Sequence, residues 1–307
     1  MTELANQFRE FKPSLRDSSI KSYVLNINKM LRHGVDLTDI DSIKDYLKDY
    51  KKTTVKNYAS SLVIYSKMNK EPSEFVEQLE KIRDDAHKEY EDMVDKNEKT
   101  EKQKQNWIPY DEIVELKEKL YEEAMDITKK NKGVELTPKQ RQKVQDALML
   151  AIYTHMPLRN DVADMKVLSV AESKNISPEW KRNKNFLVMK PSAPYFQLNH
   201  YKTSDKYGTK ELPVDERVVP LLKQWMRYNK TGYLFNNSHG TPLSSNGISK
   251  AFIRLFQEHK GKNISTSMLR HIYLSDKYAP LQEEKKKDAE MMMHSTMMQN
   301  GYVKKAD

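Results

Sequence analysis

The feature that most constrains the fold is a run of polar residues at 95–106, DKNEKTEKQKQN. It contains no apolar side chain, so it adds nothing to a hydrophobic core and is expected to be a solvated linker or a frayed helix end. Apolar residues recur at regular spacing on both sides of it. The sequence therefore predicts two domains, residues 1–93 and residues 107–307, joined by a linker at residues 94–106.

The first domain has the apolar spacing of α-helices. Ile20, Val24, Ile27 and Leu31 recur at steps of three and four residues, and Gly34 follows as a stop signal. Further helical segments are expected at 41–50, 55–65 and about 72–93.

The second domain mixes helical segments with short runs that favour β-strands. The β-favouring runs predict a small antiparallel sheet, so this domain belongs to the α+β class and the whole chain is mainly α. Methionines near 291–298 are expected to fill a core. Strands are expected at 186–189, 195–201 and 211–214, and helices at 110–130, 137–155, 215–228, 244–259, 265–278 and 281–293.

The composition favours a partner of negative charge, and the protein itself is expected inside the cell, at DNA in the cytoplasm or nucleus. The net charge is +9, from 53 basic and 44 acidic residues, and basic side chains bind polyanions by releasing counterions. Residues 1–70 carry a net charge of +5 and residues 71–93 a net charge of −6, so DNA contacts are expected on the first helices. The absence of cysteine excludes disulfides and thiolate chemistry. No signal peptide or membrane span is expected.

Five side chains offer the groups that metal-free phosphodiester transfer requires. A nucleophile must attack phosphorus, cations must neutralise the non-bridging oxygens, and an acid must protonate the leaving 5′ oxygen. Arginine suits the second task because its donors form a fixed fork. In chain order the candidates are Arg159, Lys202, Arg270, His294 and Tyr302.

This ordered set resembles the catalytic domain of the tyrosine recombinases, the phage integrases and their relatives. The resemblance covers roughly residues 107–307, and residues 1–93 resemble the family's core-binding domain in layout. The residues around Arg159 and Lys202 are most similar to recombinases of eukaryotic viruses and mobile elements. The matching motifs are Leu158-Arg159, Tyr201-Lys202-Thr203, Leu269-Arg270-His271, and His294 with Tyr302.

The chain departs from the family pattern in three places. Ser267 stands three residues before Arg270, where the family usually has a histidine. Serine can form a hydrogen bond there, but it does not titrate near neutral pH. The interval from His294 to Tyr302 is slightly short. Only five residues follow Tyr302, so we expect no long C-terminal helix beyond it.

The resemblance implies a mechanism and partners. Tyr302 would attack the scissile phosphate of double-stranded DNA and form a 3′-phosphotyrosine. Arg159, Arg270 and His294 would hold the non-bridging oxygens, with Ser267 nearby, and Lys202 would protonate the 5′ oxygen. Rejoining would need no cofactor or metal, and recombination would need self-association on DNA, commonly as a tetramer.

Two other functions fit the same residues. A type IB topoisomerase uses a similar set but religates only the original strand. A DNA-binding protein with a decayed site is the second alternative, because Ser267 replaces a titratable group. Lys202 is also compatible with a solvated basic hairpin, and either Asp161 or Asp164 could orient Arg159.

Overall fold

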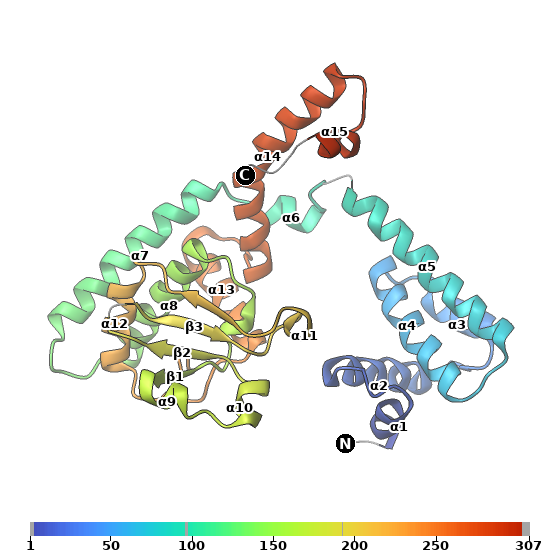
Figure 1. Cartoon of the computed structure of the whole chain (residues 1–307), viewed down its shortest axis with the longest axis horizontal. Coiled ribbons are helices and arrows are strands. Elements are labelled where there is room, and N and C mark those ends of the chain that lie inside the picture. Colours follow the sequence, from blue (N-terminus) through green and yellow to red (C-terminus); the bar gives the residue numbers. More distant parts are fainter. Residues whose placement is uncertain (1–2, 96–97, 192, 303–307) are drawn as a thin grey trace. The chain divides into compact units, whose positions relative to one another are not determined.

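The computed structural model describes residues 3–95, 98–191 and 193–302, apart from the side chains of residues 93–95, 297 and 300. Two positions of the expected linker, 96 and 97, lie outside this set. The chain divides into two compact units, Met1–Lys99 and Thr100–Asp307. Each unit is described by itself below (Figure 1).

The first unit is helical, as the apolar spacing predicted. Its core contains Phe8, Ile27, Ile43, Leu62 and Leu79, all fully buried. A polar contact also joins the second and fourth helices, where Asn26 Nδ2 donates to Ser61 Oγ over 2.9 Å. The helices are α1 (Glu3–Phe11), α2 (Asp17–Arg32), α3 (Ile40–Leu47), α4 (Lys52–Met68) and α5 (Ser73–Asp95).

The second unit is built around one buried helix, α8 (Pro138–His155). Its residues from Val144 to Thr154 are all buried, because α7, α12 and α13 pack against it. The helix begins at a capping box, in which Thr137 Oγ1 accepts from Gln140 N. Around it lie α6 (Glu101–Asn106), α7 (Tyr110–Lys130), α9 (Val170–Lys174), α10 (Pro178–Asn183), α11 (Ser204–Tyr207), α12 (Val219–Tyr228), α13 (Ser245–Lys260), α14 (Thr266–Met291) and α15 (Thr296–Tyr302).

Part of the expected linker belongs to this second unit. Residues 101–106 form α6, which starts at a capping box on Thr100. Lys262 Nζ donates to Gln105 O over 2.8 Å, and Asn263 N donates to Asn106 Oδ1 over 2.7 Å. These backbone and amide contacts hold a segment without apolar residues against the body of the unit.

The sheet is small, but it is mixed rather than antiparallel. In the described residues its strand order is β1 (Lys166–Ser169), β2 (Phe186–Met189), β3 (Tyr195–Leu198) and β4 (Lys210–Pro213). The three expected strands are β2 to β4, and they pair antiparallel. The sequence missed β1, which pairs parallel to β2. A parallel pair needs a crossover connection, and α9 and α10 lie within it.

The C-terminal helices differ from expectation. The sequence suggested helices at 265–278 and 281–293, whereas the structure has one helix, α14, with Pro280 inside it. Proline removes one backbone hydrogen bond, and the turns on either side still form. The base of α14 is anchored by buried Leu269 and Ile272 and by an edge-to-face contact of Tyr273 with Tyr110.

The outer part of α14 and α15, residues 277–302, is called the C-terminal arm below. In Figure 1 it projects from the second unit, and α15 lies beside the outer half of α14. The expectation that its methionines fill a core was wrong for the four whose side chains are described, because these face solvent, and Met297 lies outside the described side chains. The exposed fractions are 73% for Met291, 54% for Met292, 94% for Met293 and 60% for Met298.

Among the described residues, no helix combines the length and the apolar composition that crossing a bilayer requires.

The core of the second unit can be tested at two tryptophans. Trp225 is fully buried and its Nε1 donates to Leu234 O over 2.7 Å. Trp225→Ala should lower the free energy of unfolding by about 3–5 kcal/mol, because it leaves a large cavity. Trp180 is 39% exposed, and Trp180→Ala should cost about 1 kcal/mol or less. Urea denaturation followed by circular dichroism gives both values, and equal losses would contradict the placement of Trp225 in the core.

Candidate active site

Arg159 lies in a loop whose backbone is held from two sides. It precedes a 3-10 turn, η1 (Asn160–Val162), directly after α8. The hydroxyl of buried Tyr153 lies 3.2 Å from Arg159 O and 3.1 Å from Asn160 Oδ1. Asn160 Nδ2 donates to Ser245 O and Ser249 Oγ on α13, over 2.8 and 2.9 Å. The Arg159 side chain itself is exposed, so a fixed loop presents a cation to solvent.

Arg270 lies in the second turn of α14, between side chains that are anchored in the core. Its Nε is buried and has no hydrogen-bond partner among the described residues. A buried donor without a partner is costly unless a ligand supplies an acceptor. Ser267 is exposed in the first turn of the same helix, and Ser265, not Ser267, caps α14 by accepting from Met268 N.

The carboxylate of Asp161 brings the two arginines into one electrostatic cluster. Partial burial raises the pKa of Asp161, while the charges of Arg159, Arg270 and His200 act in the opposite direction. Asp161 is therefore within electrostatic range of charges from the Arg159 loop, from α14 and from the β3–β4 connection. Asp164, by contrast, forms an ion pair with Lys184, so of the two acids Asp161 is the one on which the arginine charges act.

Lys202 lies in the connection between β3 and β4. Ser204 N donates to Tyr201 O over 3.0 Å and closes the turn that contains Lys202. Across the connection, Tyr201 Oη donates to Gly208 O over 2.8 Å, and Gly208 adopts a positive φ of 64°. The Lys202 side chain is exposed. His200, two residues earlier, is one of the charges that act on Asp161.

His294 and Tyr302 lie together on the C-terminal arm. Their rings stack with centroids 5.6 Å apart and an interplanar angle of 22°. The chain turns before His294 through Met293, whose φ is 56°, while His294 N donates to Ala289 O over 3.0 Å. These bonds form a Schellman motif at the end of α14. Tyr302 is 68% exposed.

The structure does not bring this pair to the arginines of the same chain. Arg270 is near the first residue of α14 and Met291 is the last. At 1.5 Å per residue these two positions are roughly 30 Å apart along the helix. In Figure 1, α15 lies beside the far half of α14. The candidate residues therefore form two groups, one in the body of the unit and one on the arm.

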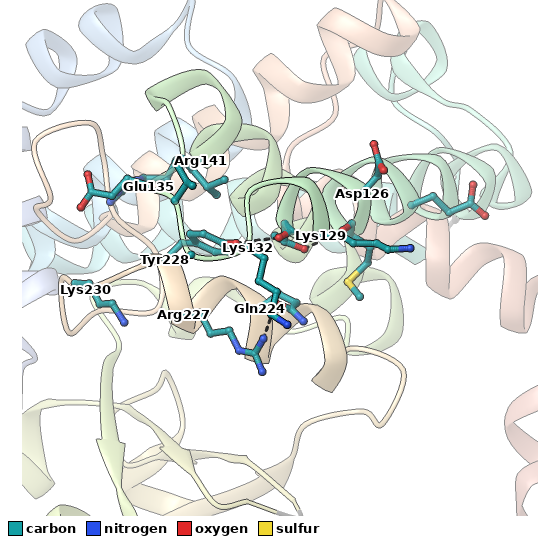
Figure 2. Close-up of a pocket in the computed structure, with 15 residues that line it drawn as sticks. Asp126, Lys129, Lys132, Glu135, Arg141, Gln224, Arg227, Tyr228 and Lys230 are labelled. Atoms are coloured by element: carbon teal, nitrogen blue, oxygen red, sulfur yellow. Dashed lines mark hydrogen bonds between the residues drawn. The ribbon is translucent and has the colours of Figure 1, made fainter.

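A separate hollow of about 860 Å³ lies where α7, α8 and α12 meet (Figure 2). Its lining mixes cations such as Lys132 and Arg227 with Asp126 and Glu135, around Tyr228. None of the six candidate residues lines it. In the described part of the chain, no cluster of three or more His, Asp or Glu side chains is placed to hold a metal ion.

Four polar residues that support the site were not singled out from the sequence: Tyr153, Asn160, Asn185 and Asn199. Asn185 and Asn199 are each 8% exposed, and Asn185 directly precedes the buried strand β2. The signal available in the sequence was a polar residue, Asn185, directly before an apolar run. The groups that Asn185 binds lie in segments distant in the sequence, so the sequence did not identify them.

Comparisons with known proteins include a similarity to a solved structure. The chain is similar to the XerH site-specific recombinase bound to its difH substrate in a pre-cleavage complex, with 15% sequence identity and a TM-score of 0.43. The similarity covers 90% of this chain and 75% of the other. No family model matches the sequence, and no curated protein matches it. The functional assignment is therefore based on the chain's own residues.

The titration of Asp161 should be visible in the stability of the protein. Its pKa is raised above 3.8 in the folded state, so the folded protein binds more protons than the unfolded one. The stability that this group contributes is present at low pH and is lost as the pH rises through the folded pKa. Asp161→Asn should remove that loss from a plot of unfolding free energy against pH. Asp164→Asn, which breaks the Lys184 ion pair, should leave it in place; the opposite pattern would contradict the assignment.

Proposed function

We propose that this protein cleaves and rejoins DNA through a 3′-phosphotyrosine on Tyr302, as tyrosine recombinases do. The observation that carries the proposal is the buried, unpartnered Nε of Arg270, together with the Asn185 side chain that joins the Arg159 loop to the base of the hairpin that carries Lys202. Two arginines at one place can neutralise the charge that develops on the non-bridging oxygens of a phosphate. The unpartnered Arg270 Nε is a donor that such an oxygen would satisfy.

The remaining groups have roles that follow from their chemistry. Lys202 is exposed at the tip of a closed turn, where an ammonium group can reach the leaving 5′ oxygen and protonate it. Tyr302 supplies the nucleophilic oxygen, and His294 stacks against its ring. Ser267 shares the first turns of α14 with Arg270 and supplies a hydroxyl where the family usually has an imidazole.

The position of the arm adds a requirement. Because Tyr302 and Arg270 are separated by most of the length of α14, cleavage needs the arm of one copy to reach the arginines of another, or the arm to bend near Pro280. We propose the first, because the arm exposes Tyr278, Leu281 and several methionines, and a neighbouring copy on DNA would cover them. This agrees with the self-association, as a tetramer, that recombination requires.

Residues 1–93 are proposed to bind the duplex together with the second unit. Their first 70 residues carry a net charge of +5, which suits phosphate contacts. The acidic helix α5 is instead proposed to face protein, since its exposed carboxylates would repel DNA.

Covalent trapping tests the proposed function directly. Nicked, labelled duplex DNA from the ends of the mobile element that the resemblance implies should form an SDS-resistant adduct with the wild-type protein. Tyr302→Phe should bind DNA normally and form no adduct, because it lacks the attacking oxygen. Arg159→Ala and Arg270→Ala should reduce adduct formation far more than binding. An adduct with Tyr302→Phe would show that another residue is the nucleophile, and a wild-type protein that binds without cleaving would support the decayed-site alternative.

Mixing variants tests where the arm acts. Arg270→Ala lacks a phosphate-binding cation and Tyr302→Phe lacks the nucleophile, so each should be inactive alone. If the arm reaches a neighbouring copy, an equimolar mixture should regain adduct formation on substrates with two sites. If the mixture stays inactive while the wild type cleaves, the arm acts within its own chain. Joined products from two different duplexes would separate a recombinase from a type IB topoisomerase.

A further inference from the structure

A buried amide connects the two parts of the candidate site that lie in the body of the second unit. Asn185 Nδ2 donates to Asp161 O over 2.8 Å and to His200 O over 2.9 Å. Its Oδ1 accepts from Asn199 N over 2.9 Å and from His200 N over 2.8 Å. The side chain thus links the Arg159 loop with the base of the hairpin that carries Lys202.

The chemistry of this position requires an asparagine. A primary amide has two donors and two acceptor lone pairs, and Asn185 uses all four. Aspartate would keep the two acceptors but would place oxygen against the carbonyls of Asp161 and His200. An apolar residue would leave the same backbone groups buried without partners, which is costly.

A second asparagine extends the connection across the hairpin. Asn199 Nδ2 donates to Lys184 O over 3.0 Å, and its Oδ1 accepts from Thr209 Oγ1 over 3.0 Å. The two ends of the β3–β4 connection are therefore tied to each other and to the residue before β2. The part of the connection between these two ends contains Lys202, whose side chain is exposed.

We propose that Asn185 is a positioning residue that acts through Lys202, by locking the base of the β3–β4 hairpin to the Arg159 loop. The inference rests on the proposed function, in which Lys202 is the acid and Arg159 binds the phosphate. Proton transfer depends on a separation near 3 Å between the donor and acceptor heavy atoms. The Lys202 amine must therefore be held at a fixed distance from the 5′ oxygen of the phosphate that the arginines bind. A misplacement of about 1 Å can cost about 10²-fold in rate.

The test compares two substrates, a normal nicked duplex and one with sulfur at the 5′ bridging position. A thiolate leaves without a proton, so the sulfur substrate does not need Lys202. Asn185→Asp should slow cleavage of the oxygen substrate by about 10²-fold. The sulfur substrate should restore most of the lost cleavage rate, as it should for Lys202→Ala. DNA binding should change little. Equal losses on both substrates would overturn the proposal, because they would indicate general damage to the site.

Asn229 provides a matched control within the same unit. It is 2% exposed, and its Nδ2 donates to Tyr233 O while its Oδ1 accepts from Thr231 Oγ1 and Asn236 Nδ2. Asn229→Asp therefore disturbs a similar buried network elsewhere. Its ratio of sulfur to oxygen cleavage rates should equal the wild-type ratio. Thr209→Val, at an exposed position, removes only the outer Asn199 bond and should give a smaller effect in the same direction as Asn185→Asp.

Hydrogen exchange tests the Asn185 link between the hairpin and the Arg159 loop independently of activity. Asn185→Asp should raise amide exchange in residues 199–209 and 159–163 together and leave residues 229–236 unchanged, whereas Asn229→Asp should do the reverse. Unchanged exchange in the hairpin would overturn the proposal even if cleavage is slow. If the wild-type protein cleaves neither substrate, the proposed function fails, and the exchange result alone decides whether Asn185 couples the two loops.

Discussion

The candidate site depends on the electrostatic interaction of one half-buried acid with two arginines. Arg159 and Arg270 come from segments far apart in the chain, and the charges of both act on the partly buried carboxylate of Asp161. Burial disfavours the charged form of that acid, while the arginines favour it. In the proposed function, a phosphate would bind to these two cations, one on the Arg159 loop and the other near the start of α14.

The supporting contacts are mainly polar. Tyr153 and Asn160 fix the Arg159 loop to α8 and α13, and Asn185 fixes the hairpin to the same loop. Asn199 ties the two ends of the hairpin to each other and to Lys184, before β2. Buried hydrogen bonds have strict geometry and are costly to break, so they set the positions of loops more narrowly than apolar contacts do. The C-terminal arm has the opposite character. The part of α14 that precedes the arm is anchored by Leu269 and Ile272, whereas Tyr278, Leu281 and the four methionines of the arm whose side chains are described are exposed. Under the proposed function, a neighbouring copy would cover these residues.

Much of the fold was predictable from local patterns. Phe186 to Met189 was expected as a strand and forms β2, and the helical stripes of the first unit form α2 to α5. The parallel strand β1 was missed because Lys166 to Ser169 is only partly buried and has no clear alternation. The exposed methionines were misassigned because their exposure depends on whether another element faces them. A sequence pattern shows which residues are apolar, but it does not show what covers them.

The sequence by itself determined the chemical groups, their order and the helices and strands that carry them, because these depend on residue type and on neighbours within a few positions. Only the tertiary structure decided that Asp164 pairs with Lys184, that Asn185 joins the Arg159 loop to the hairpin, and that Tyr302 lies at the far end of α14. Each of these depends on contacts between segments that are distant in the chain, and such contacts form only when packing removes water from between them.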